Sequence, residues 1–275
     1  MEFAAERTVP GAIERAVTRH ASREALVEND VRVSYDTLLE RVREAAAGFV
    51  AAGLASGDTV ALWAPNSIDW AIASLAVLFA GGTVVPLNTR YTASEASDIV
   101  TRARCRFIVA SGPFLGRTLA AEAVAMTAGR PGSPTVVSFD RTAHDGAELW
   151  ADLLRAGGSG ADVETRLRAL TPDHISHLQF TSGTTGRPKG AMLRHEPMVV
   201  TTAEWAAIVG VQPGDRYPVV SPYSISEGTR RGCSQASHPV RPPTRSRRSI
   251  STAWSRRSRP KEPPCCRALR RCTTH

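Results

Sequence analysis

Lysine and cysteine are scarce in this chain of 275 residues, and their scarcity already limits what the protein can be. Of the 34 Lys and Arg residues, only two are lysines, Lys189 and Lys261. A lysine in such an arginine-rich chain indicates a position chosen for its chemistry. Four of the five cysteines follow residue 230, so residues 1–229 contain only Cys105 and no disulfide framework. This pattern predicts a cytoplasmic protein rather than a disulfide-stabilised secreted one.

Uninterrupted apolar runs long enough to cross a membrane are also missing. Residues 1–20 carry scattered charges and no apolar core, so we expect no secretory signal. Residues 70–87 are almost continuously apolar, but Gly81, Gly82 and Pro86 interrupt them. Those interruptions favour a buried helix that turns into a strand over a membrane span.

Charge divides the chain into two predicted parts. Residues 230–275 carry thirteen Lys and Arg and one acid, a net charge of +12. Residues 1–229 carry 21 bases and 25 acids, a net charge of −4, so the basic character belongs to the tail alone. The tail is rich in Arg, Pro, Ser and Cys and has no helical or strand period. Such a composition buries too little apolar surface to offset chain entropy, so we expect disorder.

Residues 1–229 alternate between helix and strand signals. Ser34 and Asn66 are predicted to cap two helices, and Gly53 is predicted to end the first of them. A third helix is expected at 94–103. Short apolar segments predict strands at 59–63, 83–86, 107–109 and 135–137. This order predicts an α/β fold with layered, largely parallel sheets that helices cover on both faces.

The segment from Phe180 to Gly190 carries the strongest functional signal. It reads Phe-Thr-Ser-Gly-Thr-Thr-Gly-Arg-Pro-Lys-Gly and follows a short apolar run. Glycines let backbone N–H groups approach an anion closely, and Lys189 adds a point cation, which is what binding a polyphosphate requires. The segment is not a Walker A loop, because Pro188 precedes the lysine and Gly190 follows it.

This segment resembles the phosphate-binding signature of the adenylate-forming enzymes, a superfamily of acyl-CoA synthetases, luciferases and peptide-synthetase adenylation domains. The family pattern is Ser/Thr-Ser/Gly-Gly-Thr-Thr-Gly-x-Pro-Lys-Gly, and every position matches. Earlier blocks at 57–61, 65–66 and 80–88 are similar to the acyl-CoA synthetase branch. The resemblance covers about residues 8–229 and ends abruptly, which implies an incomplete N-terminal domain of such an enzyme.

The resemblance implies an AMP-forming acid–CoA ligase, which couples a carboxylic acid to ATP and passes the acyl group to CoA. It places the β- and γ-phosphates against six residues and the cation of Lys189, and it gives Thr184 a share in holding Mg²⁺. The six are Thr181, Ser182, Gly183, Thr184, Thr185 and Gly186. Tyr223 is implied to line the acyl pocket, where Ile225 replaces the family's histidine. No catalytic residue is assigned, and His195 is expected to be structural.

The family's later blocks, which hold adenine and ribose and supply a catalytic lysine, are not recognisable in this sequence. We therefore expect a truncated, inactive chain that binds nucleotide weakly. An adenylation domain that loads a carrier protein fits the same motif. Three interpretations of residues 230–275 remain: a nucleic-acid-binding arm, a metal site of Cys265, Cys266, Cys272 and His275, or a frameshift in a GC-rich gene. The frameshift is favoured, because GC-rich codons read out of frame give this composition.

Overall fold

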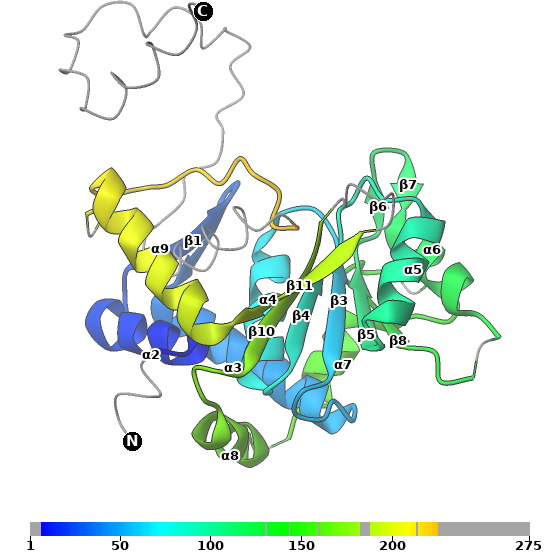
Figure 1. The fold of residues 1–275 in the computed structure, drawn as a ribbon, viewed down its shortest axis with the longest axis horizontal. Coiled ribbons are helices and arrows are strands. Elements are labelled where there is room, and N and C mark those ends of the chain that lie inside the picture. Colours follow the sequence, from blue (N-terminus) through cyan, green and yellow to red (C-terminus); the bar gives the residue numbers. More distant parts are fainter. Residues whose placement is uncertain are drawn as a thin grey trace, which may run out of the picture. The chain divides into compact units, whose positions relative to one another are not determined.

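The computed structural model describes residues 7–129, 131–142, 144–158, 160–181, 188–212 and 214–224. Its main sheet has seven strands: β3 (Thr59–Trp63), β4 (Thr83–Pro86), β5 (Cys105–Ala110), β8 (Thr135–Ser138), β9 (Glu148–Leu149), β10 (Ile175–Thr181) and β11 (Lys189–Arg194). Their order across the sheet is β11-β10-β4-β3-β5-β8-β9 (Figure 1). Six strands are parallel, and β11 pairs antiparallel with β10 at one edge.

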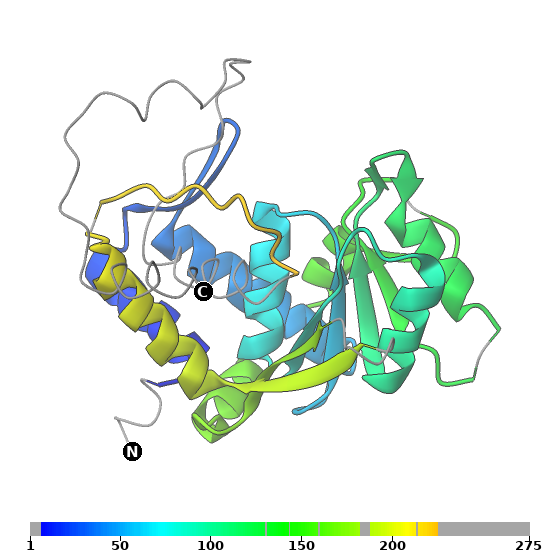
Figure 2. The same cartoon turned by 45° about the horizontal axis from the view of Figure 1, so that its top comes forward.

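Helices cover both faces of this sheet, as Figure 2 shows. Buried side chains of one face pack with α2 (Val9–His20), α3 (Tyr35–Ala51), α4 (Ile68–Phe79), α7 (Trp150–Arg155), α8 (Ala161–Ala169) and α9 (His195–Val209). The opposite face packs with α5 (Ala93–Arg102) and α6 (Leu119–Thr127). Along β3, Val60 and Leu62 belong to the first cluster, and Ala61 and Trp63 belong to the second. The predicted α/β fold with a largely parallel, doubly covered sheet is confirmed.

Two small hairpins complete the described elements. One joins β1 (Glu24–Glu28) to β2 (Val31–Ser34), and the other joins β6 (Pro113–Phe114) to β7 (Arg117–Thr118). None of the described helices combines the length and the apolarity needed to cross a membrane. Residues 230–275 lie outside the described residues, so the boundary at residue 229 and the interpretations of the tail stay predictions.

The helix boundaries follow local capping chemistry, with one correction to the sequence-based prediction. The Ser34 hydroxyl accepts a hydrogen bond from the Thr37 N–H and caps α3, and Gly53 follows that helix with a φ of 90°, both as predicted. The predicted cap at Asn66 is wrong. Ser67 caps α4 by accepting from the Trp70 N–H, which leaves the Asn66 amide for a long-range contact.

Candidate functional site

The ends of β10 and β11 carry the described part of the predicted phosphate-binding segment. Thr181, the last residue of β10, pairs with Lys189, the first residue of β11. The intervening site residues Ser182, Gly183, Thr184, Thr185 and Gly186 lie outside the described residues, and the predicted magnesium ligand Thr184 is among them. The strand pairing therefore brings Thr181 and Lys189 side by side, although seven residues separate them in the sequence.

Side-chain alternation places Thr181 and Lys189 on one face of the sheet. Residues directly opposite each other in an antiparallel pair project to the same side, with Cβ atoms about 5 Å apart. Both residues are exposed. Among the residues that the structure describes, no carboxylate forms an ion pair with Lys189. A hydroxyl and an ammonium group thus lie together at the strand ends, and both groups fit an anionic ligand.

The neighbouring pair, Phe180 and Gly190, projects to the opposite face. Phe180 is buried with the side chains of α5 and α6. A Cβ atom added at Gly190 would lie 3.2 Å from Cζ of Phe180 and 3.1 Å from Cδ1 of Leu178. The glycine therefore lets these two apolar side chains close over the backbone of the edge strand and holds the strand pair against the core.

Tyr223 lies on the same face as Thr181 and Lys189. It is buried with the α3 and α4 cluster, and its ring centroid is 4.8 Å from that of Trp70. Two residues before Thr181 on β10, Gln179 donates from Nε2 to the backbone carbonyl of Ser224 at 2.6 Å. The structure thus ties the predicted acyl-pocket residue to the strand that leads into the predicted phosphate segment. Ile225 lies outside the described residues.

Asn66 holds the Tyr223 segment in place from the start of α4. Its Oδ1 accepts from the Tyr223 N–H at 2.7 Å, and its Nδ2 donates to the Ser221 carbonyl at 2.9 Å. The two hydrogen bonds satisfy backbone groups on both sides of residue 222, as the backbone of a neighbouring strand would do. This role was not predictable from the neighbouring residues, which made Asn66 the expected helix cap.

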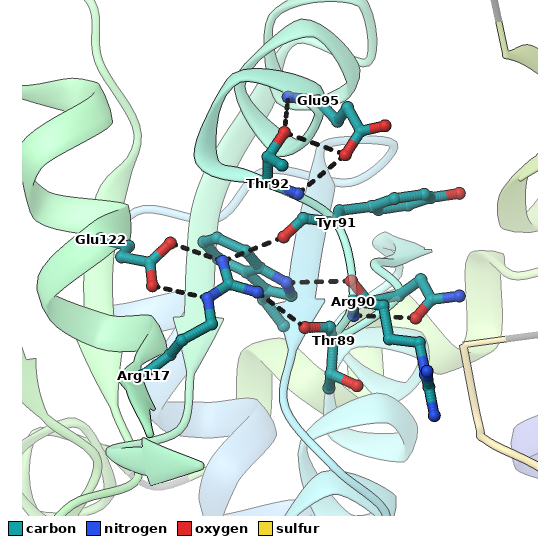
Figure 3. A network of polar contacts seen from close by, with 9 residues as sticks. Thr89, Arg90, Tyr91, Thr92, Glu95, Arg117 and Glu122 are labelled. Carbon is teal, nitrogen blue, oxygen red and sulfur yellow. Dashed lines mark hydrogen bonds and ion pairs between the residues drawn. The ribbon is translucent and has the colours of Figure 1, made fainter. Parts of the chain in front are cut away.

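Arg117 organises the loop that follows β4 (Figure 3). Its guanidinium donates to the carbonyls of Thr89 and Tyr91 at 3.0 Å each and pairs through two nitrogens with Glu122. It also lies 5.5 Å from the ring centroid of Trp63. β4 is the parallel neighbour of β10, so the carboxyl end of β4 lies on the same side of the sheet as Thr181, the last residue of β10. Ligands of open α/β sheets bind outside the carboxyl ends of the strands, and Arg117 therefore shapes the border of the candidate site.

Two histidines near the site are fully buried. Nδ1 of His177 lies 3.0 Å from the Ser176 hydroxyl, and Nδ1 of His195 accepts from the Val9 N–H at 3.2 Å. Burial lowers the pKa of His177 to about 3, with a further lowering from His195. Burial also lowers the pKa of His195 to about 4, with His174 adding to it. Both rings are therefore neutral at pH 7, and the contact of His195 with the start of α2 fits the structural role expected for it.

No group of His, Cys, Asp and Glu able to hold a metal ion occurs among the described residues. Such groups form sites in which protein side chains supply most of the metal ligands. A magnesium ion that travels with ATP takes most of its oxygen ligands from phosphates and water, and it needs few from the protein. The predicted protein ligand of such an ion, Thr184, lies outside the described residues.

Comparison with known proteins defines the class. Residues 13–233 match the AMP-binding enzyme family, and the chain belongs to this family. The chain is 39% identical over 227 residues to the 3-[(3aS,4S,7aS)-7a-methyl-1,5-dioxo-octahydro-1H-inden-4-yl]propanoyl:CoA ligase of Mycobacterium tuberculosis, covering 82% of this chain and 44% of that protein. It is 31% identical over 209 residues to the mitochondrial medium-chain acyl-CoA ligase ACSF2 of Danio rerio, covering 70% of this chain and 34% of that protein.

A solved structure agrees with this family assignment. The inhibitor-bound N-terminal domain of FACL13 from Mycobacterium tuberculosis superposes with a TM-score of 0.69 at 25% identity, over 86% of this chain and 57% of that one. The predicted resemblance to the acyl-CoA synthetase branch, through its N-terminal part, is confirmed. The chain spans less than half the length of the two curated relatives.

Proposed function

We propose that this chain is the N-terminal part of an AMP-forming acid–CoA ligase, a cytoplasmic enzyme that activates a carboxylic acid with ATP and transfers the acyl group to CoA. The arrangement of Thr181, Lys189 and Tyr223 on one face of the sheet carries the proposal. It joins the predicted phosphate contacts to the predicted acyl-pocket residue through Gln179. Membership of the AMP-binding family and similarity to two acyl-CoA ligases support the reaction class.

Charge neutralisation is the main task of this part of the enzyme. In the proposed reaction a carboxylate oxygen attacks the α-phosphorus of ATP, and pyrophosphate leaves as an acyl-adenylate forms. Bound Mg²⁺ would supply neutralisation of the departing pyrophosphate. Lys189 would hold a positive charge against the β- and γ-phosphates, and the segment from Thr181 to Gly186 would donate hydrogen bonds to them, with Thr184 beside the metal. Fixed charges of this kind act mainly by stabilising the transition state.

Tyr223 is proposed to border the acyl group. Its ring is held against Trp70, and the backbone around it is fixed by Asn66 and Gln179, so it presents a rigid apolar wall. One relative is named for a fused-ring propanoyl group and another for medium-chain acids, so the relatives differ in their acids.

The chain alone is proposed to bind ATP weakly and to give no turnover, because no segment of its sequence resembles the family's adenine, ribose or catalytic-lysine blocks. Resequencing the gene and translating both alternative frames after codon 229 tests whether those blocks are encoded in another reading frame. We expect one frame to restore those blocks, and the extended protein to release AMP and form an acyl-CoA from a carboxylic acid, ATP and CoA. If neither frame restores them, or if the 275-residue chain itself forms acyl-CoA, the proposal is wrong.

A further inference from the structure

One side chain of α5 contacts both arms of the β10–β11 hairpin. Nη1 of Arg102 donates to the carbonyl oxygen of Pro188 at 2.8 Å, and the guanidinium carbon lies 5.2 Å from the ring centroid of Phe180. Asp98, one turn earlier on the helix, accepts from the same nitrogen at 3.1 Å. Phe180 directly precedes Thr181, and Pro188 directly precedes Lys189. Arg102 therefore meets the residues that flank both phosphate-facing positions.

Arg102 acts from the face opposite to the predicted phosphate contacts. Phe180, over which it stacks, belongs to the cluster of α5 and α6, whereas Thr181 and Lys189 project to the other side. The Arg102 side chain is 39% exposed, and its guanidinium already contacts Asp98, a carbonyl and an aromatic ring. Through its hydrogen bond to Pro188, Arg102 therefore acts on the backbone that carries Lys189.

The contact with Pro188 constrains Lys189 through the planar peptide bond. The carbonyl oxygen of Pro188 lies in one plane with the backbone nitrogen and Cα of Lys189, so holding the oxygen fixes where the lysine side chain starts. The proline ring restricts φ on the other side of that carbonyl. A hydrogen bond from a charged donor is stronger than a neutral one, and stacking on Phe180 adds a second attachment.

We infer that Arg102 is a positioning residue, which holds the Pro188–Lys189 peptide against Phe180 so that the Lys189 ammonium group is presented to the phosphates. The inference rests on the proposed function for its consequence, but the constraint on the backbone is a separate claim. The arginine has no direct role with ATP. Replacing it should loosen the start of β11 and weaken phosphate binding, and the rest of the fold should keep its stability.

The scarcity of lysine provides a clean assay of the backbone constraint. Endoproteinase Lys-C cleaves after lysine, and this chain offers only Lys189 and Lys261. Cleavage after Lys189 requires local opening of the first residues of β11, and cleavage after Lys261 is an internal reference for protease activity in the same sample. In Arg102→Gln the ratio of cleavage at Lys189 to cleavage at Lys261 should rise about tenfold, the factor for loss of one charge-assisted contact.

Two further arginine variants control the result. Arg166 donates from Nη1 to the carbonyls of Leu54 and Ala80, away from the hairpin, so Arg166→Gln removes a comparable contact and should leave the cleavage ratio unchanged. Arg102→Lys retains a charged donor but loses the planar group, and its ratio should fall between those of the wild type and Arg102→Gln. If Arg102→Gln does not fold, the Arg102→Lys comparison decides.

Repeating the digestion with Mg²⁺ and ATP separates this inference from the proposed function. ATP should slow cleavage at Lys189 in the wild type, and about tenfold more ATP should be needed in Arg102→Gln. Absence of any ATP effect in the wild type would contradict the proposed binding role and would leave the cleavage comparison intact. The positioning role is overturned if the Arg102 variants cleave like the wild type, or if Arg166→Gln raises the ratio equally.

Discussion

The two buried histidines make the stability of this fold sensitive to mild acid. His177 and His195 are fully buried, and their pKa values are lowered to about 3 and about 4. In the unfolded chain each has an ordinary pKa of about 6.5. Between these values the unfolded chain binds more protons than the folded one, so the free energy of unfolding must fall as the pH falls.

The size of the effect follows from the same pKa values. Between pH 7 and pH 5 each buried histidine lowers the free energy of unfolding by about 2 kcal/mol, and the pair by about 4 kcal/mol. That loss is large against a total stability of about 5–15 kcal/mol for a typical domain. The window lies above the range in which most carboxylates titrate, so the histidines dominate it.

Chemical denaturation at pH 7, 6 and 5 measures this effect. In His177→Gln the loss between pH 7 and pH 5 should shrink by about 2 kcal/mol, whatever the variant's stability at pH 7, because one titrating group is gone. His20→Gln, at the end of α2, is the matched control, since it removes a histidine that is not fully buried. If His177→Gln keeps the wild-type pH dependence, the buried ring is not the source, and the reasoning fails.

Three substitutions test contacts around the candidate site by urea denaturation at pH 7. Gly190→Ala should cost about 1–2 kcal/mol, because its Cβ would press on the side chain of Phe180 at 3.2 Å, and an unchanged midpoint would refute that crowding. Asn66→Ala should cost about 2 kcal/mol, since it leaves the Tyr223 N–H without its acceptor. A loss below a few tenths of a kcal/mol would contradict the role of Asn66 in holding the Tyr223 segment. Arg117→Gln should cost about 2 kcal/mol, whereas no loss would show that the loop after β4 holds without it.

The sequence predicts the elements that depend on neighbouring residues. Ser34 caps α3 through Thr37, three residues away, and Gly53 adopts the positive φ that a helix end favours, so both signals are visible in a short window. The parallel sheet is predictable for the same reason, because each strand buried on both faces reads as a short apolar run. Alternation with helices then fixes the parallel direction.

Long-range polar contacts could not be predicted in this way. Asn66 and Ser67 are both good cap residues, and the choice depends on Ser221, which is 155 residues away from Asn66. Arg102 reaches Pro188 across 86 residues, and nothing in the composition of α5 distinguishes it from a surface arginine. The motif therefore predicted a phosphate-binding segment, whereas the long-range contacts around it are visible only in the fold.

The most direct test of the account compares the two lysines as ATP contacts. Binding of ATP with Mg²⁺ to the whole chain is measured by ligand-observed NMR for the wild type, Lys189→Ala and Lys261→Ala, which change the net charge equally. The account predicts weak binding, with a Kd above about 1 mM in the wild type. The Kd should rise about tenfold or more in Lys189→Ala and stay unchanged in Lys261→Ala. Equal binding in all three proteins, or an equal loss in both variants, would contradict the assignment of Lys189 as a phosphate contact.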